Sequence, residues 1–277
     1  MPLDESREGG VMAPASLIEG AAGILRCPDP AGKIALSHSV AAAWRSGTLP
    51  VGERMMPPDR PARPGCPLLL LPRDMPRRRA GGAKSSRIAL LHAVAHIELN
   101  AIDLAWDLVA RFEAPGAGFH DDWVRVADEE ASHHGLLAAR LTEYSAAYGD
   151  LPAHDGLWEA AEATAHDLLA RLAVVPLVLE ARGLDVTLPM IESLSRAGDH
   201  ASADALRIIY RDEIGHVEIG RRWFELVCRQ RGLAPITAWH DLVRRHYGGI
   251  LKQPFNKSAR AAAGFDPTYY EPLAERA

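Results

Sequence analysis

Two segments, DEEASHH at 128–134 and RDEIGHV at 211–217, decide the fold, because each contains a glutamate three positions before a histidine. The two pairs are Glu130 with His133 and Glu213 with His216. Residues three apart lie on one face of an α-helix, so each pair can present a carboxylate and an imidazole to a single point. We interpret the pairs as two parts of one metal site on two helices.

Two further glutamates occupy matching places in the chain. Glu98 lies 32 residues before Glu130, and Glu180 lies 33 residues before Glu213. The sequence therefore reads as two helix pairs, each a Glu followed by Glu-x-x-His, joined by a long crossover. This is the ligand set of di-iron and di-manganese carboxylate bundles.

The residue types indicate which metals the site would hold. Four carboxylates offset the charge of two divalent ions, and one imidazole per ion adds a neutral donor. Hard oxygen ligands suit iron and manganese better than structural zinc. We predict two iron ions, with Mn/Fe or Mn/Mn as alternatives. The predicted ligands are Glu98, Glu130, His133, Glu180, Glu213 and His216.

Other assignments stay open at these positions. Taken singly, each polar residue also fits a solvated helix face, and a one-position slip would make Glu129 and His134 the ligands. Metal-bound histidines usually donate their other ring N–H to a carboxylate, so we predict that Glu129 and Asp212 fill that role. Three further histidines are expected to be surface or packed residues: His92, His96 and His166.

Helical periodicity and end signals predict an all-α protein. The expected long helices cover 85–112, 121–149, 155–183 and 199–232, with shorter ones at 15–25, 33–44, 187–198 and 235–247. Pro176 predicts a kink, because it frees the carbonyl of Leu172. We expect a four-helix bundle at 85–232.

The ends of the chain differ from this bundle. Residues 1–84 are expected to form an arm with short helices, and eight of the 20 prolines fall between 50 and 76, which predicts an extended, irregular segment. Residues 233–277 are expected to pack on the bundle as a short helix and tail. A basic patch in the arm could contact an anionic substrate or RNA phosphate, although a solvated loop is the commoner outcome. Its central residues are Arg77, Arg78 and Arg79.

Composition bounds the class of protein. The 277 residues are 48% hydrophobic and 24% charged, with a formal net charge of −5. No apolar run approaches the ~20 residues of a membrane span, and the first residues do not resemble a secretory signal, so we expect a cytoplasmic protein away from membranes. Three widely separated cysteines argue against cysteine-ligated zinc and iron–sulfur clusters.

Several stretches resemble a bacterial ferritin-like family known only as domain of unknown function 455. They include LLHAVAHIELNAIDLAWD from Leu90, HDDWVRVADEEASHH from His120, RDEIGHVEIGRRWF from Arg211 and QPFNKSARAAAGF from Gln253. The resemblance covers nearly the whole chain and implies a ferritin-like four-helix bundle with a di-iron site at the six positions above. It does not supply a reaction. More distant relatives of similar ligand pattern include di-iron hydroxylases, one group of which acts on modified tRNA, which is an analogy of fold alone.

We expect an O₂-dependent oxidoreductase or hydroxylase that acts on an organic substrate, with the arm and tail covering a substrate pocket. The alternatives are an iron-handling or peroxide-scavenging protein, an RNA-associated protein using the basic arm, and a metal-free helical scaffold. A small molecule or a modified nucleotide would be the substrate. The sequence allows a homodimer and identifies neither the substrate, the catalytic residues nor the electron donor.

Overall fold

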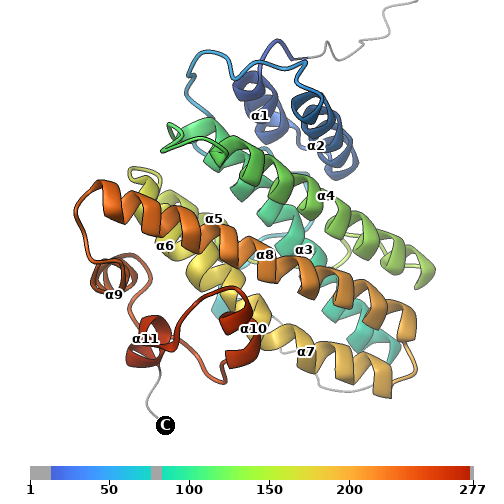
Figure 1. The fold of residues 1–277 in the computed structure, drawn as a ribbon. Coiled ribbons are helices and arrows are strands. Elements are labelled where there is room, and N and C mark those ends of the chain that lie inside the picture. The colour runs from blue at the N-terminus through green and yellow to red at the C-terminus, as the bar shows by residue number, and fades with distance from the viewer. Residues whose placement is uncertain (1–13, 76–82, 275–277) are drawn as a thin grey trace, which may run out of the picture.

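The computed structural model describes residues 14–75 and 83–274, and this part of the chain is helical with two isolated β-bridges and no strand (Figure 1). The all-α prediction is confirmed. A π-helical turn at Val175–Glu180 joins α6 to α7. The helices are α1 Leu17–Arg26, α2 Pro30–Arg45, α3 Lys84–Arg111, α4 Phe119–Glu143, α5 Gly156–Ala163, α6 Leu168–Val174, α7 Ala181–Arg196, α8 His200–Gln230, α9 Pro235–His246, α10 Lys257–Ala262 and α11 Pro267–Tyr270.

Four long helical segments lie side by side at the centre of the molecule (Figure 1). They are α3, α4, α8 and the continuous run of α6, the π-helical turn and α7. The helix α3 packs along α4, α7 packs along α8, and α4 contacts α8, which joins the two pairs. Buried Trp106 of α3, Trp123 of α4 and Trp223 of α8 belong to one core.

The third segment differs from the sequence prediction. Instead of helices at 155–183 and 187–198, α5 ends at Ala163, and a new helix begins at Leu168 and continues to Arg196. The Asp167 carboxylate accepts a hydrogen bond from the Leu169 N–H and so starts the new helix. Gly183 does not end it, because an interior glycine costs only about 1 kcal/mol, which packing against α8 can offset.

The second long helix is also shorter than predicted, since α4 ends at Glu143 rather than near residue 149. Ser145 adopts a positive φ of 56°, a conformation that cannot continue a right-handed helix. The segment that follows leads to Gly149, whose φ of 107° is available to glycine at low cost.

Pro176 lies in the π-helical turn, where the sequence predicted a kink. A proline removes one backbone donor, and a π-turn is one way for a helix to accommodate the break. Gly220 of α8 faces this turn, and a Cβ built on it would lie 2.2 Å from the Cβ of Pro176. The close approach of α8 to the turn therefore requires glycine at this position.

The arm and the C-terminal region cover the four segments. The helices α1 and α2 pack on α3 and α4, whereas α9, α10 and α11 lie on the side of α6, α7 and α8 (Figure 1). Buried residues of the arm, the four segments and the C-terminal region share one hydrophobic cluster. The fully buried ammonium of Lys33 in α2 pairs with Asp103 of α3, which ties the arm to the centre.

One helix in the described part of the chain, α3, is long and apolar enough to cross a membrane by length and composition. However, 72% of its most apolar stretch is buried inside the protein, as in the core helix of a soluble protein.

Candidate metal centre

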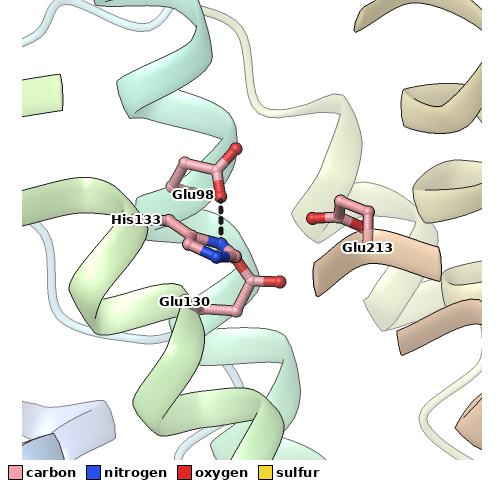
Figure 2. Close-up of side chains that lie close together, drawn as sticks. All are labelled: Glu98, Glu130, His133 and Glu213. Carbon is pink, nitrogen blue, oxygen red and sulfur yellow. Dashed lines mark hydrogen bonds and ion pairs between the residues drawn. The ribbon is translucent and has the colours of Figure 1, made fainter. Parts of the chain in front are cut away.

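All four long segments contribute side chains to one point in the interior. Four of these side chains, on α3, α4 and α8, offer ligand atoms that lie within 4.8 Å of one another, and all four residues are buried. Figure 2 shows three of these side chains gathered between α3 and α4, with the fourth approaching from α8. The four are Glu98, Glu130, His133 and Glu213.

Glu130 lies between the two imidazoles. Its Oε2 is 3.3 Å from Nδ1 of His133, and its Oε1 is 3.0 Å from Nδ1 of His216. Nδ1 of His133 also lies 3.3 Å from Oε2 of Glu98, and Nδ1 of His216 lies 3.7 Å from Oε1 of Glu213. Each imidazole thus points the same nitrogen at two carboxylates, and Glu130 contacts both rings.

Glu180 and His216 lie outside the tightest group of four but next to it. Glu180 ends the π-helical turn, and its Oε2 is buried. Burial raises the pKa of Glu180 well above its usual value, and the charge of Glu213 raises it further. The structure therefore brings all six sequence-predicted residues together.

The outer nitrogen of each imidazole is held by a carboxylate from the opposite helix. Nε2 of His216 on α8 lies 2.8 Å from Oε2 of Glu129 on α4. Nε2 of His133 on α4 lies 3.2 Å from Oδ2 of Asp212 on α8. These hydrogen bonds leave Nδ1 of both rings facing the four glutamates, which is the orientation a metal-ligating histidine needs.

The pKa values of the carboxyl groups in this group are shifted in opposite directions. Burial raises the pKa of Glu98 well above its usual value, and the charge of Glu130 adds to this effect. Burial would also raise the pKa of Glu130, but hydrogen bonds from His133 and His216 outweigh it and lower that pKa. Burial alone would lower the pKa of His133, yet hydrogen bonds to Glu130 and Glu98 raise it to about 11. Glu130 therefore carries the negative charge of this group, whereas burial favours the neutral form of Glu98.

Unsatisfied atoms provide an independent test of whether these residues fit a metal. Within the described residues, two buried oxygens of this group, Glu180 Oε2 and Glu213 Oε2, have neither a hydrogen bond nor an ion pair. Three more buried atoms contact other members of the group at 3.0 to 3.3 Å: Glu98 Oε2, Glu130 Oε1 and His216 Nδ1. Leaving a buried polar atom unsatisfied costs ~1–3 kcal/mol, so carboxylate oxygens without a partner in this acidic group fit a bound cation.

The alternative assignments are placed elsewhere. Nδ1 of His134 lies 2.9 Å from the Ala95 carbonyl, so it faces α3, and Glu129 contacts the outer edge of His216. The geometry thus disfavours the one-position slip. His92 and His96 are buried beside Tyr148, and His166 is exposed. The basic patch residues Arg77, Arg78 and Arg79 lie outside the described residues.

A cavity of about 260 Å³ that was not predicted from the sequence lies beside the carboxylates. It runs between α3 and α7 and is lined by Glu98, Glu180 and Glu213 but by neither ligand-group histidine. Gly183 of α7 also lines it, and a Cβ built there would meet nothing within 4 Å. In the sequence, Gly183 was interpreted as the end of a helix, so the space beside it was not predicted.

Comparison with known proteins identifies the family of this chain. The chain is 44% identical over 211 residues to an uncharacterized protein of Haemophilus influenzae, which covers 74% of this chain and 73% of the relative. No solved structure matches the chain significantly. The model of the family described as "Protein of unknown function (DUF455)" matches residues 26–271. The chain therefore belongs to the DUF455 family.

Proposed function

We propose that the protein is a dinuclear metal protein with a ferritin-like four-helix bundle, and that its two ions are iron. The observation that carries the proposal is the convergence of four glutamates and two Nδ1 atoms, with two buried carboxylate oxygens that have no partner within the described residues. Oxygen-rich donor sets of this kind suit iron and manganese, so Mn/Fe and Mn/Mn pairs remain alternatives.

We further propose that the centre is an O₂-dependent oxidoreductase or hydroxylase for an organic substrate. Two ferrous ions bound here would supply electrons for the reduction of dioxygen. The protein's own part is to hold them through Glu98, Glu130, Glu180 and Glu213, to fix both imidazoles, and to exclude bulk water.

The cavity favours this reading over iron handling or peroxide removal. An iron store or a peroxidase of small peroxides needs no pocket for an organic molecule, whereas this cavity reaches three of the four glutamates. Met75 of the arm and Tyr247 after α9 both line it, which supports the expectation that the additions to the bundle help to enclose a substrate. A cytoplasmic location and a homodimer remain predictions.

Metal content tests the first part of the proposal. Purified protein reconstituted with ferrous ion should hold two iron ions per chain by elemental analysis. Glu213→Ala should lose at least one of them, because Glu213 is one of the four closest ligand residues. Glu218→Ala is the matched control on the same helix, since Glu218 pairs with Arg222 outside the site. Wild-type protein that retains neither iron nor manganese would overturn the proposal.

Oxygen consumption tests the second part. Reduced iron-loaded protein should take up O₂ faster with a bound organic molecule than without it, and an oxidised product should be detected by mass spectrometry. Iron oxidation that is insensitive to every organic compound, with peroxide turnover instead, would favour the iron-handling alternative.

A further inference from the structure

We propose that the cavity beside Glu98, Glu180 and Glu213 binds a compact, uncharged and mainly apolar organic molecule as the substrate of the metal centre. This inference rests on the proposed function and specifies its substrate class.

The walls of the cavity are mainly aliphatic. The α3 side is formed by small and branched side chains, the α7 side includes Val186 and Met190, and α8 adds Leu206 and Ile209. Such walls offer contact area but few hydrogen bonds, so they select by shape and apolar character. The apolar lining residues of α3 are Ala93, Val94, Ile97, Ala101 and Leu104.

Two polar side chains of the lining outside the glutamate group, His96 and Thr187, are already engaged within the protein. His96 contacts the Tyr148 hydroxyl and the His154 carbonyl at 2.9 and 3.0 Å. The Thr187 hydroxyl donates to the Gly183 carbonyl at 2.8 Å. An occupant with many polar groups would have to break these bonds or leave its own groups unsatisfied, which is costly in a buried site.

Arg182 is the one arginine among the described residues of the lining, and its Nη1 is already engaged. Its Nη1 donates to the carbonyls of Lys252 and Pro254 at 2.9 and 3.3 Å, and it pairs with Asp185. Within the described part of the chain, the lining therefore has no free cluster of cations to hold a phosphate or carboxylate. This absence of a built anion site disfavours a nucleotide.

The deep end of the cavity favours a neutral molecule for a second reason. Without metals, three carboxylates line this end and would repel an anion. With two divalent ions, the four glutamates of the centre offset the positive charge, so the floor is close to neutral. Neither state attracts an anion through a strong charge pair, and the metal-loaded state does not attract a cation either.

The size of the cavity limits the molecule as well. A volume of about 260 Å³ lies just below the ~300–1,000 Å³ that is typical of small-molecule sites. Ile97 and Tyr247 line the cavity and are exposed, so it opens to the surface between α3 and the segment after α9. A single ring system fits this space, whereas a polynucleotide does not.

Gly183 offers a substitution that fills the cavity without disturbing the fold. It lies inside α7, lines the cavity and has free space at its Cβ position. Gly183→Leu should extend into the cavity and improve the helix propensity of α7. Gly23→Leu is the matched control, because Gly23 is an exposed glycine of α1 that also has free space at its Cβ.

The experiment is isothermal titration calorimetry of the iron-loaded, anaerobic protein with three neutral probes: indole, 4-ethylphenol and cyclohexanone. Indole-3-acetate and adenosine 5′-monophosphate are the charged counterparts. At least one neutral probe should bind, more tightly than either anion. Gly183→Leu should weaken that binding tenfold or more, whereas Gly23→Leu should not change it. The iron content of both variants should equal that of the wild type.

Two results would overturn the inference: tighter binding of an anion than of every neutral probe, or neutral binding that Gly183→Leu leaves unchanged. Failure of the proposed function gives a different pattern. In that case the wild type holds no metal, while neutral probes still bind and Gly183→Leu still blocks them.

Discussion

Oε2 of Glu129 on α4 lies 2.8 Å from Nε2 of His216 on α8, so a carboxylate of one helix orients the imidazole of the other. The relation is reciprocal, because Asp212 of α8 lies next to Nε2 of His133 on α4. Both histidine orientations therefore depend on the packing of α4 against α8 as well as on the local helix spacing.

Replacing this carboxylate should weaken metal binding without loss of the fold. Glu129→Gln retains the shape of the side chain but removes its charge, and changes of this kind cost ~10–100-fold in metal affinity. Competition with a chelator of known affinity measures the effect. Glu218→Gln on α8 should bind metal as the wild type does. Equal affinities in all three proteins would show that Glu129 has no influence on the centre.

Gly220→Ala should destabilise the protein and displace Glu180. The added Cβ would meet Pro176 at 2.2 Å, so α8 must move away from the π-helical turn. Overpacking of this type costs ~1–3 kcal/mol of unfolding free energy, and the metal content should fall as well. Gly215→Ala, on the same helix with nothing within 4 Å of its Cβ, should keep or slightly raise the stability. Urea unfolding of both variants checks this prediction. An unchanged free energy of unfolding in Gly220→Ala would contradict the packing argument.

Arg171 and Asp107 form a buried ion pair. Removing one partner should destabilise the protein more than removing both. Arg171 is fully buried and also donates to the Ala161 carbonyl at 2.7 Å. Asp107→Leu leaves the guanidinium without its counter-charge, which costs ~3–5 kcal/mol. Adding Arg171→Met should recover part of that loss in urea unfolding, because Arg111, which also pairs with Asp107, stays without its partner. A double variant as unstable as Asp107→Leu would show that the pair is favourable in itself.

His96 should make the metal-free protein sensitive to acid. Burial lowers its pKa from 6.5 to about 4. Below pH 6.5 the unfolded chain takes up a proton first, so the free energy of unfolding falls by up to about 3 kcal/mol as the pH approaches 4. Above pH 6.5 the residue has no such effect.

His96→Gln removes this group, so its stability should decline less steeply between pH 6.5 and 4 than that of the parent. Denaturant unfolding at several pH values gives both slopes. Parallel slopes would contradict the assignment of the acid sensitivity to His96.

Local signals predicted most of the helices. The expected helices at 85–112, 199–232 and 235–247 match α3, α8 and α9 within two residues at each end, because apolar periodicity and end signals lie in the sequence itself. The segment from 149 to 198 was mispredicted, since Gly183 and Pro189 lie inside a helix that tertiary packing supports. The short helices α10 and α11 were not predicted, because their few residues carry no clear period.

The candidate site divides in the same way. Spacing along the chain brought out the six glutamates and histidines, since each pair is a property of one helix and the repeat relates the pairs. Which carboxylate holds which imidazole depends on the crossing of α4 and α8, which spacing does not encode. The cavity depends on the distance between α3 and α7, which cannot be read from the sequence of either segment.

The cavity touches three glutamates of the centre and neither imidazole. On the other side, the imidazoles contact Glu129 and Asp212, whose side chains are 37% and 20% exposed. The six residues thus face a mainly apolar cavity on one side and two partly exposed carboxylates on the other. If the proposed function holds, an organic guest and a proton would use different routes, so a change in one route can leave the other working.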